Sequence, residues 1–334
     1  MRSGITSLFS LDFRLPPPQT VFAVVRSDRL WYHTIVLKIN LTDLLEVDKK
    51  DYSDLFSTVE HEITCADVPA ASIRLHFVRH NAGGRAPINK VVDTLVSYIT
   101  HFCFTAERRA GLGEQARNRN FVKAKKLFRK SPTTGQPGEL LAYFLIEALL
   151  QAPQILKKMP LTTNPNDERK GSDGVHARWV GENDLLEIIF AEAKMHQNFS
   201  AALTSAFASM TDFHNSETKD LEINYFLAAF SLLDAEQQKV IESYVEGEEK
   251  GKCQDVHACL IGHSWKEYDC LKDARKKEFL TEFEERYLAW ATLEMKPLLD
   301  DKLATFVHTH VRLEFFFLPF VSVDDFRALF LASL

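Results

Sequence analysis

The chain has 334 residues, of which 46% are hydrophobic and 26% charged, a composition typical of a soluble globular protein of about two domains. Its formal net charge of -6 and pI near 6.1 exclude a protein that binds nucleic acid through an overall basic surface, so any such contact must come from a local patch, a metal site or a partner. Five cysteines without a paired spacing indicate reduced thiols, and the absence of a long apolar stretch or signal peptide predicts a cytoplasmic protein without a membrane span.

Residues 1–130 favour an N-terminal α+β domain. Apolar runs predict strands at Thr20–Val25, Leu30–Ile39 and Ser72–Val78, and apolar residues at helical spacing predict a helix over Ile88–Phe104. No catalytic chemistry is evident in this region.

The end of this region, from Glu107 to Lys130, has nine basic and two acidic residues, a net charge of +7. It fits either a solvated linker helix or a patch that contacts DNA phosphates. The candidate DNA-binding residues are Arg117, Arg119, Lys123, Lys125, Lys126, Arg129 and Lys130. The turn-rich stretch 131–138 then predicts a boundary, with a second domain over 131–334.

Glu139–Gln151 is predicted to be a helix with an apolar stripe through Ala142, Tyr143, Ile146 and Leu150. Glu139 stands at the first turn of this inward face. A carboxylate there can simply be favourable charge at a helix N-terminus, or it can belong to a site.

A hairpin is predicted downstream. Val175–Val180 and Leu185–Ala193 are typical of strands, and residues 181–184 between them have turn chemistry. If residues 181–184 close a symmetric antiparallel hairpin, Val180 faces Leu185, and the numbers of every facing pair sum to 365. The numbers of Asp173 and Glu192 also sum to 365, so these two residues are predicted to face each other. Facing residues share a side of the sheet, and Lys194, two residues after Glu192, shares it too.

Two carboxylates and an ammonium therefore converge at the open end of the hairpin. Paired carboxylates bind hard divalent cations such as Mg²⁺, which polarise a phosphate and activate water. Lys194 can orient that water or stabilise developing charge. The less specific alternative is a solvated salt bridge at an exposed hairpin end.

The remaining chain predicts further elements. Asn198 or Ser200 can cap a helix to about Phe213, and a strand is expected over Val256–Trp265. Five residues in this part, Cys253, His257, Cys259, His263 and Cys270, invite a zinc site, but their spacing fits no common zinc finger and a strand should turn alternate side chains to opposite faces. The last expected elements are helices over 217–233, 235–245 and 272–299, a strand over 313–320 and a helix from 323.

Asp173 followed by Glu192-Ala193-Lys194 resembles the active-site motif of the PD-(D/E)xK nuclease superfamily. With Gly138-Glu139 and the string from Gly171 to His176, the chain resembles the HamA nuclease subunits of Hachiman antiphage defence systems and the related AbpA proteins. The resemblance is tightest over 138–206. No proline precedes Asp173, which departs from the superfamily pattern.

The resemblance implies a restriction-endonuclease-like core that hydrolyses DNA with Mg²⁺ or Mn²⁺. It implies that Asp173 and Glu192 hold the metal, that Glu139 assists them, and that Lys194 is catalytic. It further implies a stable heterocomplex with a superfamily 2 helicase in a prokaryotic cytoplasm, in which the N-terminal domain over residues 1–130 is expected to supply much of the contact. Two alternatives stay open: a restriction or junction-resolving nuclease, and a catalytically idle DNA-sensing or adaptor subunit.

Overall fold

The computed structural model describes residues 39–59, 71–78, 87–159, 171–181, 185–230, 235–270 and 276–334. All of them belong to one compact unit, Leu37–Leu334. The predicted strand Thr20–Val25, and Leu30–Ile39 except its last residue, lie outside the described residues.

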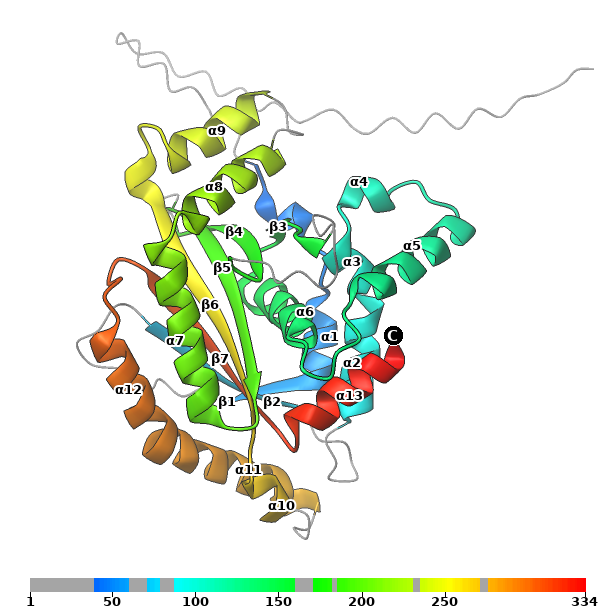
Figure 1. Ribbon diagram of the computed structural model, residues 1–334, viewed down its shortest axis with the longest axis vertical. Helices are drawn as coiled ribbons and strands as arrows, with labels where there is room; N and C mark the ends of the chain where they lie inside the picture. Colours follow the sequence, from blue (N-terminus) through cyan, green and yellow to red (C-terminus); the bar gives the residue numbers. More distant parts are fainter. Residues whose placement is uncertain are drawn as a thin grey trace, which may run out of the picture. The chain divides into compact units, whose positions relative to one another are not determined.

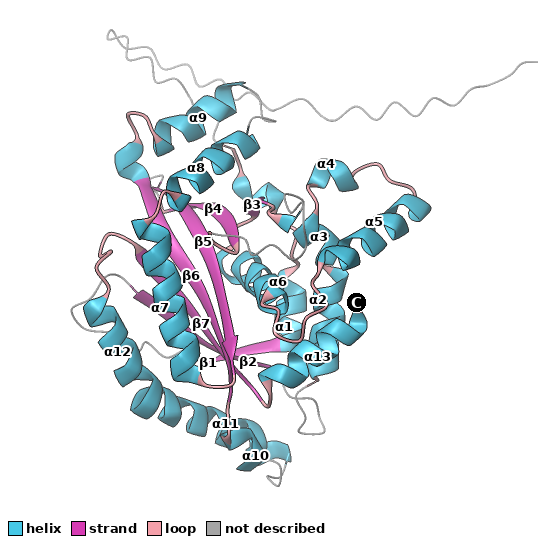
Figure 2. Cartoon of the chain, in the orientation of Figure 1, coloured by secondary structure: helices cyan, strands magenta, loops and turns pink. Residues whose placement is uncertain are grey.

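The architecture is mixed α+β, built on one seven-stranded sheet (Figure 2). The strand order is β1-β2-β7-β6-β5-β4-β3. The four adjacent strands β2, β7, β6 and β5 are parallel to one another. The pairs β1–β2, β4–β5 and β3–β4 are antiparallel. The strands are β1 (Phe56–Val59), β2 (Ala71–Val78), β3 (Gln154–Leu156), β4 (Gly174–Val180), β5 (Leu185–His196), β6 (Cys253–Ser264) and β7 (Arg312–Phe320).

Helices pack on both faces of the sheet (Figure 1). One face is covered by α2 (Ile88–Ser97), α3 (Ile99–Cys103), α6 (Gln136–Leu145) and α13 (Val323–Ser333). The opposite face is covered by α7 (Phe199–Asn215), α11 (Lys276–Trp290) and α12 (Lys296–Thr305), with α8 (Thr218–Ala229) and α9 (Ala235–Val245) over the β4–β5 end. No helix in these described ranges is long and apolar enough to cross a membrane.

The central strands are buried on both faces, which explains their continuous apolar sequences. On β5, Ile189, Ala191, Ala193 and Met195 face the α6 side, whereas alternate residues such as Phe190 face the α7 side. This alternation assigns Glu192 and Lys194 to the α7 side of the sheet.

Further helices and helical turns complete the described chain. They are a 3-10 turn at Leu41–Leu44, α1 (Lys49–Leu55), α4 (Ala106–Arg109), α5 (Glu114–Leu127), α10 (Glu267–Cys270), a 3-10 turn at Lys250–Lys252, and π-helical turns at Ile146–Leu150 and Ala291–Met295.

Most predicted elements in the described residues are confirmed with shifted ends. The helix expected over Ile88–Phe104 breaks into α2 and α3 at Tyr98. Asn198 caps α7 as expected, because its side chain accepts a hydrogen bond from the Ala201 N–H.

The structure differs from the division expected after residue 130. The strand β2 precedes that point and pairs with β7 near the end of the chain, so one sheet spans both parts. The buried Glu147 carboxylate also accepts hydrogen bonds from the Glu46 and Val47 N–H groups and from that of Gln154. The described part of the N-terminal region therefore contributes to the same compact unit as the hairpin.

Candidate active site

The β4–β5 hairpin has the register that the sequence predicts. Its ladder runs from Val180 opposite Leu185 to Gly174 opposite Ala191, and each facing pair sums to 365. Just beyond the ladder, the Asp173 N–H donates to the Ala191 carbonyl at 2.7 Å. The Asp173 carboxylate in turn accepts the Ala193 N–H at 2.7 Å, which holds this side chain beside the Glu192 position of β5.

Glu192 and Lys194 form an ion pair, with Lys194 Nζ 2.6 Å from Glu192 Oε1. Burial, with the nearby charge of Asp173, raises the pKa of Glu192 to about 7. Burial also raises the pKa of Asp173 above its usual range, although Lys194 opposes the shift. Burial alone would lower the pKa of Lys194, but the two carboxylates outweigh it and the pKa is raised. The site thus holds more negative charge than one lysine neutralises, and a divalent cation would relieve that imbalance.

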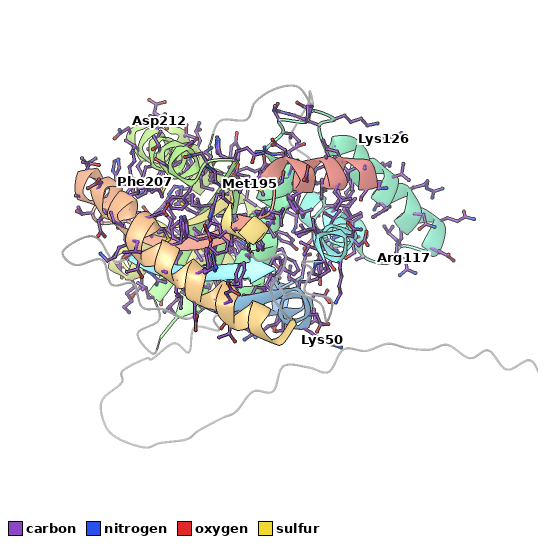
Figure 3. The ribbon with its side chains drawn as sticks, turned by 90° about the horizontal axis from the view of Figure 1, so that it is seen from below. Lys50, Arg117, Lys126, Met195, Phe207 and Asp212 are labelled. Carbon is purple, nitrogen blue, oxygen red and sulfur yellow. The ribbon has the colours of Figure 1, made fainter. Side chains whose placement is uncertain are left out.

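These side chains line a cleft of about 740 Å³. Glu139 lines the same cleft from the first turn of α6, and Arg129 lines it from the segment before that helix. The helix can come this close because Gly138 has no side chain: a Cβ there would lie 3.0 Å from the Met195 sulphur on β5. Figure 3 shows Asp212 of α7 and Lys126 of α5 on either side of Met195.

The three carboxylates do not form a preassembled cage. In the described parts of the chain, Glu139, Asp173 and Glu192 do not bring three ligand oxygens within 4.8 Å of one another. Asp173 and Glu192 nevertheless suit Mg²⁺, which is commonly held by one or two carboxylates plus waters and substrate phosphate. The structure thus groups Glu139, Asp173, Glu192 and Lys194 around one cleft.

A buried support behind Asp173 was not apparent from the sequence. The Glu222 carboxylate on α8 accepts the Ser172 N–H at 2.9 Å and the Ser172 hydroxyl at 2.5 Å. Lys158 donates to Glu222 and to the Ser172 carbonyl, bridging α8 to the residue before Asp173. On the other side, the Ser209 hydroxyl of α7 hydrogen-bonds Glu192. No local motif marks Glu222, which lies 50 residues after Ser172.

Gly171 is required by this support. Its φ is +111°, and an added Cβ would overlap Oε1 of Glu222. We expect Gly171→Ala to lower the free energy of unfolding by about 1–3 kcal/mol, because it adds backbone strain and displaces Glu222. Urea denaturation would measure this loss.

The matched control is Gly251→Ala, since Gly251 lies in an exposed turn with no atom within 4 Å of an added Cβ. This variant is expected to stay within about 0.5 kcal/mol of the parent. Equal stability of the two variants would contradict a structural requirement for glycine at 171.

His176 is a structural residue rather than a base. It is buried on the α6 side, its Nδ1 lies 2.9 Å from the Ala152 carbonyl, and burial lowers its pKa to about 3. A histidine in this state is neutral and does not line the cleft.

The candidate DNA-binding residues divide into two groups. Arg129 lines the cleft, whereas most of the others lie along α5, where the only buried residue is Ala124. Figure 3 shows the Arg117 and Lys126 side chains pointing outward from that helix. The exposed members are Arg117, Arg119, Lys123, Lys126 and Lys130, and Lys125 lies over the Phe121 ring. The cleft thus has a basic flank, which agrees with both readings of the sequence.

Contrary to the expectation from the sequence, the Cys/His residues of β6 do not alternate between the two faces of the strand. Cys253, His257, Cys259 and His263 share one face of the strand, because their numbers are all odd. They are spread along the 12-residue strand β6, and Cys259 contacts Met210 while His263 stacks on Trp290. The described residues bring none of these four into a three-ligand group, and the Cys270 side chain lies outside the described residues.

The comparisons with known proteins agree with the resemblance seen in the sequence. No curated protein matches the chain. The sequence model of the HamA family matches residues 53–334, which include the hairpin, the cleft residues and the support behind Asp173. The chain therefore belongs to the HamA family, and this membership indicates a role in antiphage defence.

Proposed function

We propose that this protein is a metal-dependent deoxyribonuclease with a restriction-endonuclease-like core, and that it is the effector of a two-component antiphage defence system. The observation that carries the proposal is the convergence of Asp173, Glu192 and Lys194 at one end of the β4–β5 hairpin, within a cleft of about 740 Å³. Family membership supports the defence context.

The donor set fits Mg²⁺ or Mn²⁺. Asp173 and Glu192 would hold the ion, and Glu139 would act from across the cleft, directly or through water. When bound, the cation polarises a scissile phosphate and favours deprotonation of an attacking water. The pKa values of the two carboxyls are raised mainly by burial and, at Glu192, also by the charge of Asp173. This supports the assignment, because buried carboxylates held close together are stabilised by a bound cation.

Lys194 would act on the substrate side. It shares the sheet face of Glu192 and remains 24% exposed at its side chain, so its ammonium can reach the cleft. Once a cation takes over the Glu192 charge, Lys194 is available to orient the nucleophilic water or stabilise charge developing on phosphate oxygens. Arg129 and the basic residues of α5 would contact the DNA backbone without reading its sequence.

The proposed partner is a superfamily 2 helicase. The sequence contains no Gly-x4-Gly-Lys-Ser/Thr phosphate-binding loop, so this chain lacks the usual ATP-binding motif. Because the chain has a net charge of -6, we expect it to bind DNA by itself only through the basic residues of α5 and Arg129. A partner that engages DNA, spends ATP and controls access to the cleft would supply both functions in a cytoplasmic complex.

Co-expression with the helicase gene encoded alongside tests this arrangement. We expect the two chains to co-purify and the cleavage rate to depend on helicase and ATP. Full-rate cleavage by the single chain, with no effect of the helicase, would reject the partner while leaving the nuclease in place. DNA binding by the complex without cleavage under any metal condition would favour the idle DNA-sensing alternative.

The charge imbalance predicts how stability depends on pH. The folded-state pKa of Glu192, about 7, lies above the ordinary value near 4.3, so the folded protein binds this proton more tightly than the unfolded chain. Stability should therefore fall as pH rises from about 4 to 7 and then level off. We expect metal-free Glu192→Gln to exceed the parent in stability by on the order of 1–3 kcal/mol at pH 8, and by less at pH 5.

Thermal melts with EDTA at the two pH values would measure this difference. Mg²⁺ added at pH 8 should raise the melting temperature of the parent but not that of Glu192→Gln. A constant stability difference across this pH range would show that Glu192 is not the titrating group.

A further inference from the structure

A second cluster of metal-ligating side chains, separate from the four predicted site residues, lies where α7 ends and where β6 and β7 begin. His214 is in the last turn of α7, Asp255 is the third residue of β6, and His310 precedes β7. One ligand atom from each of these three residues lies within 4.8 Å of the others. Three segments that are distant in sequence thus meet at the end of the sheet where β6 and β7 begin.

Two more histidines surround this trio. Nδ1 of His257 lies 3.1 Å from Nε2 of His214, and the His308 ring lies 5.1 Å from the His214 ring and 6.0 Å from the His310 ring. The Nε2 atoms of His257 and His308 are buried and have no hydrogen-bond partner within the described ranges. Packing alone gives no reason to gather four imidazoles here, since each unsatisfied buried polar group costs about 1–3 kcal/mol.

We propose that His214, Asp255 and His310 bind one transition-metal ion, with Zn²⁺ the best match. Two imidazole nitrogens and one carboxylate suit Zn²⁺ and similar ions, whereas Mg²⁺ prefers oxygen ligands only. His257 stands beside His214 as an orienting partner, as neighbours of metal-bound imidazoles commonly do. The proposal does not depend on the proposed nuclease function.

The position of the site indicates what the ion would do. His214 follows Ser209 and Asp212 on α7, two residues that line the cleft. Phe190 and Phe213, whose rings are 4.8 Å apart, pack against His214 and His257. Metal binding would therefore fasten the end of α7, and with it one wall of the cleft, to the starts of β6 and β7.

Lys219 opposes metal binding. Its ammonium pairs with Asp255 Oδ2, so an incoming cation must displace it from that carboxylate. Removing the positive charge while keeping the stem of the side chain, as in Lys219→Met, should make binding several-fold tighter. A cluster that is only an ion pair with stacked histidines would give no such gain.

Zinc titration of the full chain tests the proposal. The protein is stripped with EDTA, dialysed into excess Mg²⁺ to occupy the carboxylate site, and titrated with ZnCl₂ against a chromophoric chelator. We expect one zinc equivalent in the parent and in Glu192→Gln. The double variant His214→Ala/His310→Ala loses two of the three proposed ligands. We expect its zinc affinity to fall by more than about 100-fold, because losing a residue that only orients a ligand already lowers metal affinity by roughly 10- to 100-fold.

His310→Ala keeps the test independent of folding, because His310 is exposed and its truncation leaves the core intact. Zinc binding should fall in this single variant while its thermal melt in EDTA matches that of the parent. No zinc uptake by the parent in Mg²⁺, or equal uptake by the double variant, would overturn the proposal. Loss of the equivalent in Glu192→Gln would place the zinc in the carboxylate site instead.

Discussion

Lys194→Met is expected to reduce DNA cleavage by roughly 10²–10³-fold while leaving Mg²⁺ binding intact, whereas Asp173→Asn should remove both. The difference follows from the geometry. Lys194 is paired with Glu192 at 2.6 Å and supplies only positive charge, so its loss leaves the metal-binding oxygens in place. Asp173 supplies one of two facing carboxylates, and its amide would retain the hydrogen bond from Ala193 without the charge.

Cleavage of linear DNA in Mg²⁺, measured beside the Mg²⁺-induced rise in melting temperature, separates these effects. Glu249→Gln is the control, because Glu249 forms an exposed ion pair with Lys252 far along the chain from the hairpin. It should keep full activity and the full thermal shift. If Asp173→Asn still cleaved DNA at the parental rate, the catalytic site would have to lie elsewhere.

The largest expected loss of stability comes from Arg312→Ala. Arg312, at the start of β7, donates to Glu187 of β5 and to Glu314, and both carboxylates are fully buried. Arg178 also pairs with Glu187, at 2.6 Å, so the three charged groups of β5 and β7 and the arginine of β4 form one network. Removing one member of a buried ionic network typically costs about 3–5 kcal/mol, because it leaves uncompensated buried charge.

Arg286→Ala is the matched comparison. Arg286 also pairs with two carboxylates, those of Glu267 and Glu282, but the three side chains are 36–42% exposed. Each such surface pair contributes about 0–1 kcal/mol, so chemical denaturation should show a small change. Similar losses in the two arginine variants would show that burial does not determine the contribution of the Arg312 network.

Local patterns predicted the part of the site that depends on one hairpin. Turn-type residues at 181–184 and two apolar runs predicted the register that the β4–β5 ladder has, and this register predicted that Asp173 lies beside Glu192. Strand alternation then placed Lys194 on the same face. These inferences succeeded because strand pairing across a short turn is a local property of the sequence.

Long-range pairing was beyond such patterns. The pairing of β2 with β7 joins residues more than 200 positions apart, and no composition shift announces it, whereas the turn-rich stretch 131–138 suggested a boundary inside the compact unit. Glu222 and His214 looked like ordinary helix residues. Their contacts with Ser172 and His257 exist only after α7 and α8 pack on the sheet.

The most direct test of the central claim is the metal dependence of cleavage by the purified complex of this chain with its helicase. DNA is incubated with ATP and either Mg²⁺ or EDTA. A parallel Mg²⁺ reaction uses the complex with Asp173→Asn in this chain, and helicase ATPase activity in Mg²⁺ confirms that the partner is intact. The account predicts cleavage only by the parent complex in Mg²⁺. Cleavage that persists in EDTA, or that the Asp173→Asn complex performs at the parental rate, would contradict a metal-dependent nuclease built on the β4–β5 hairpin.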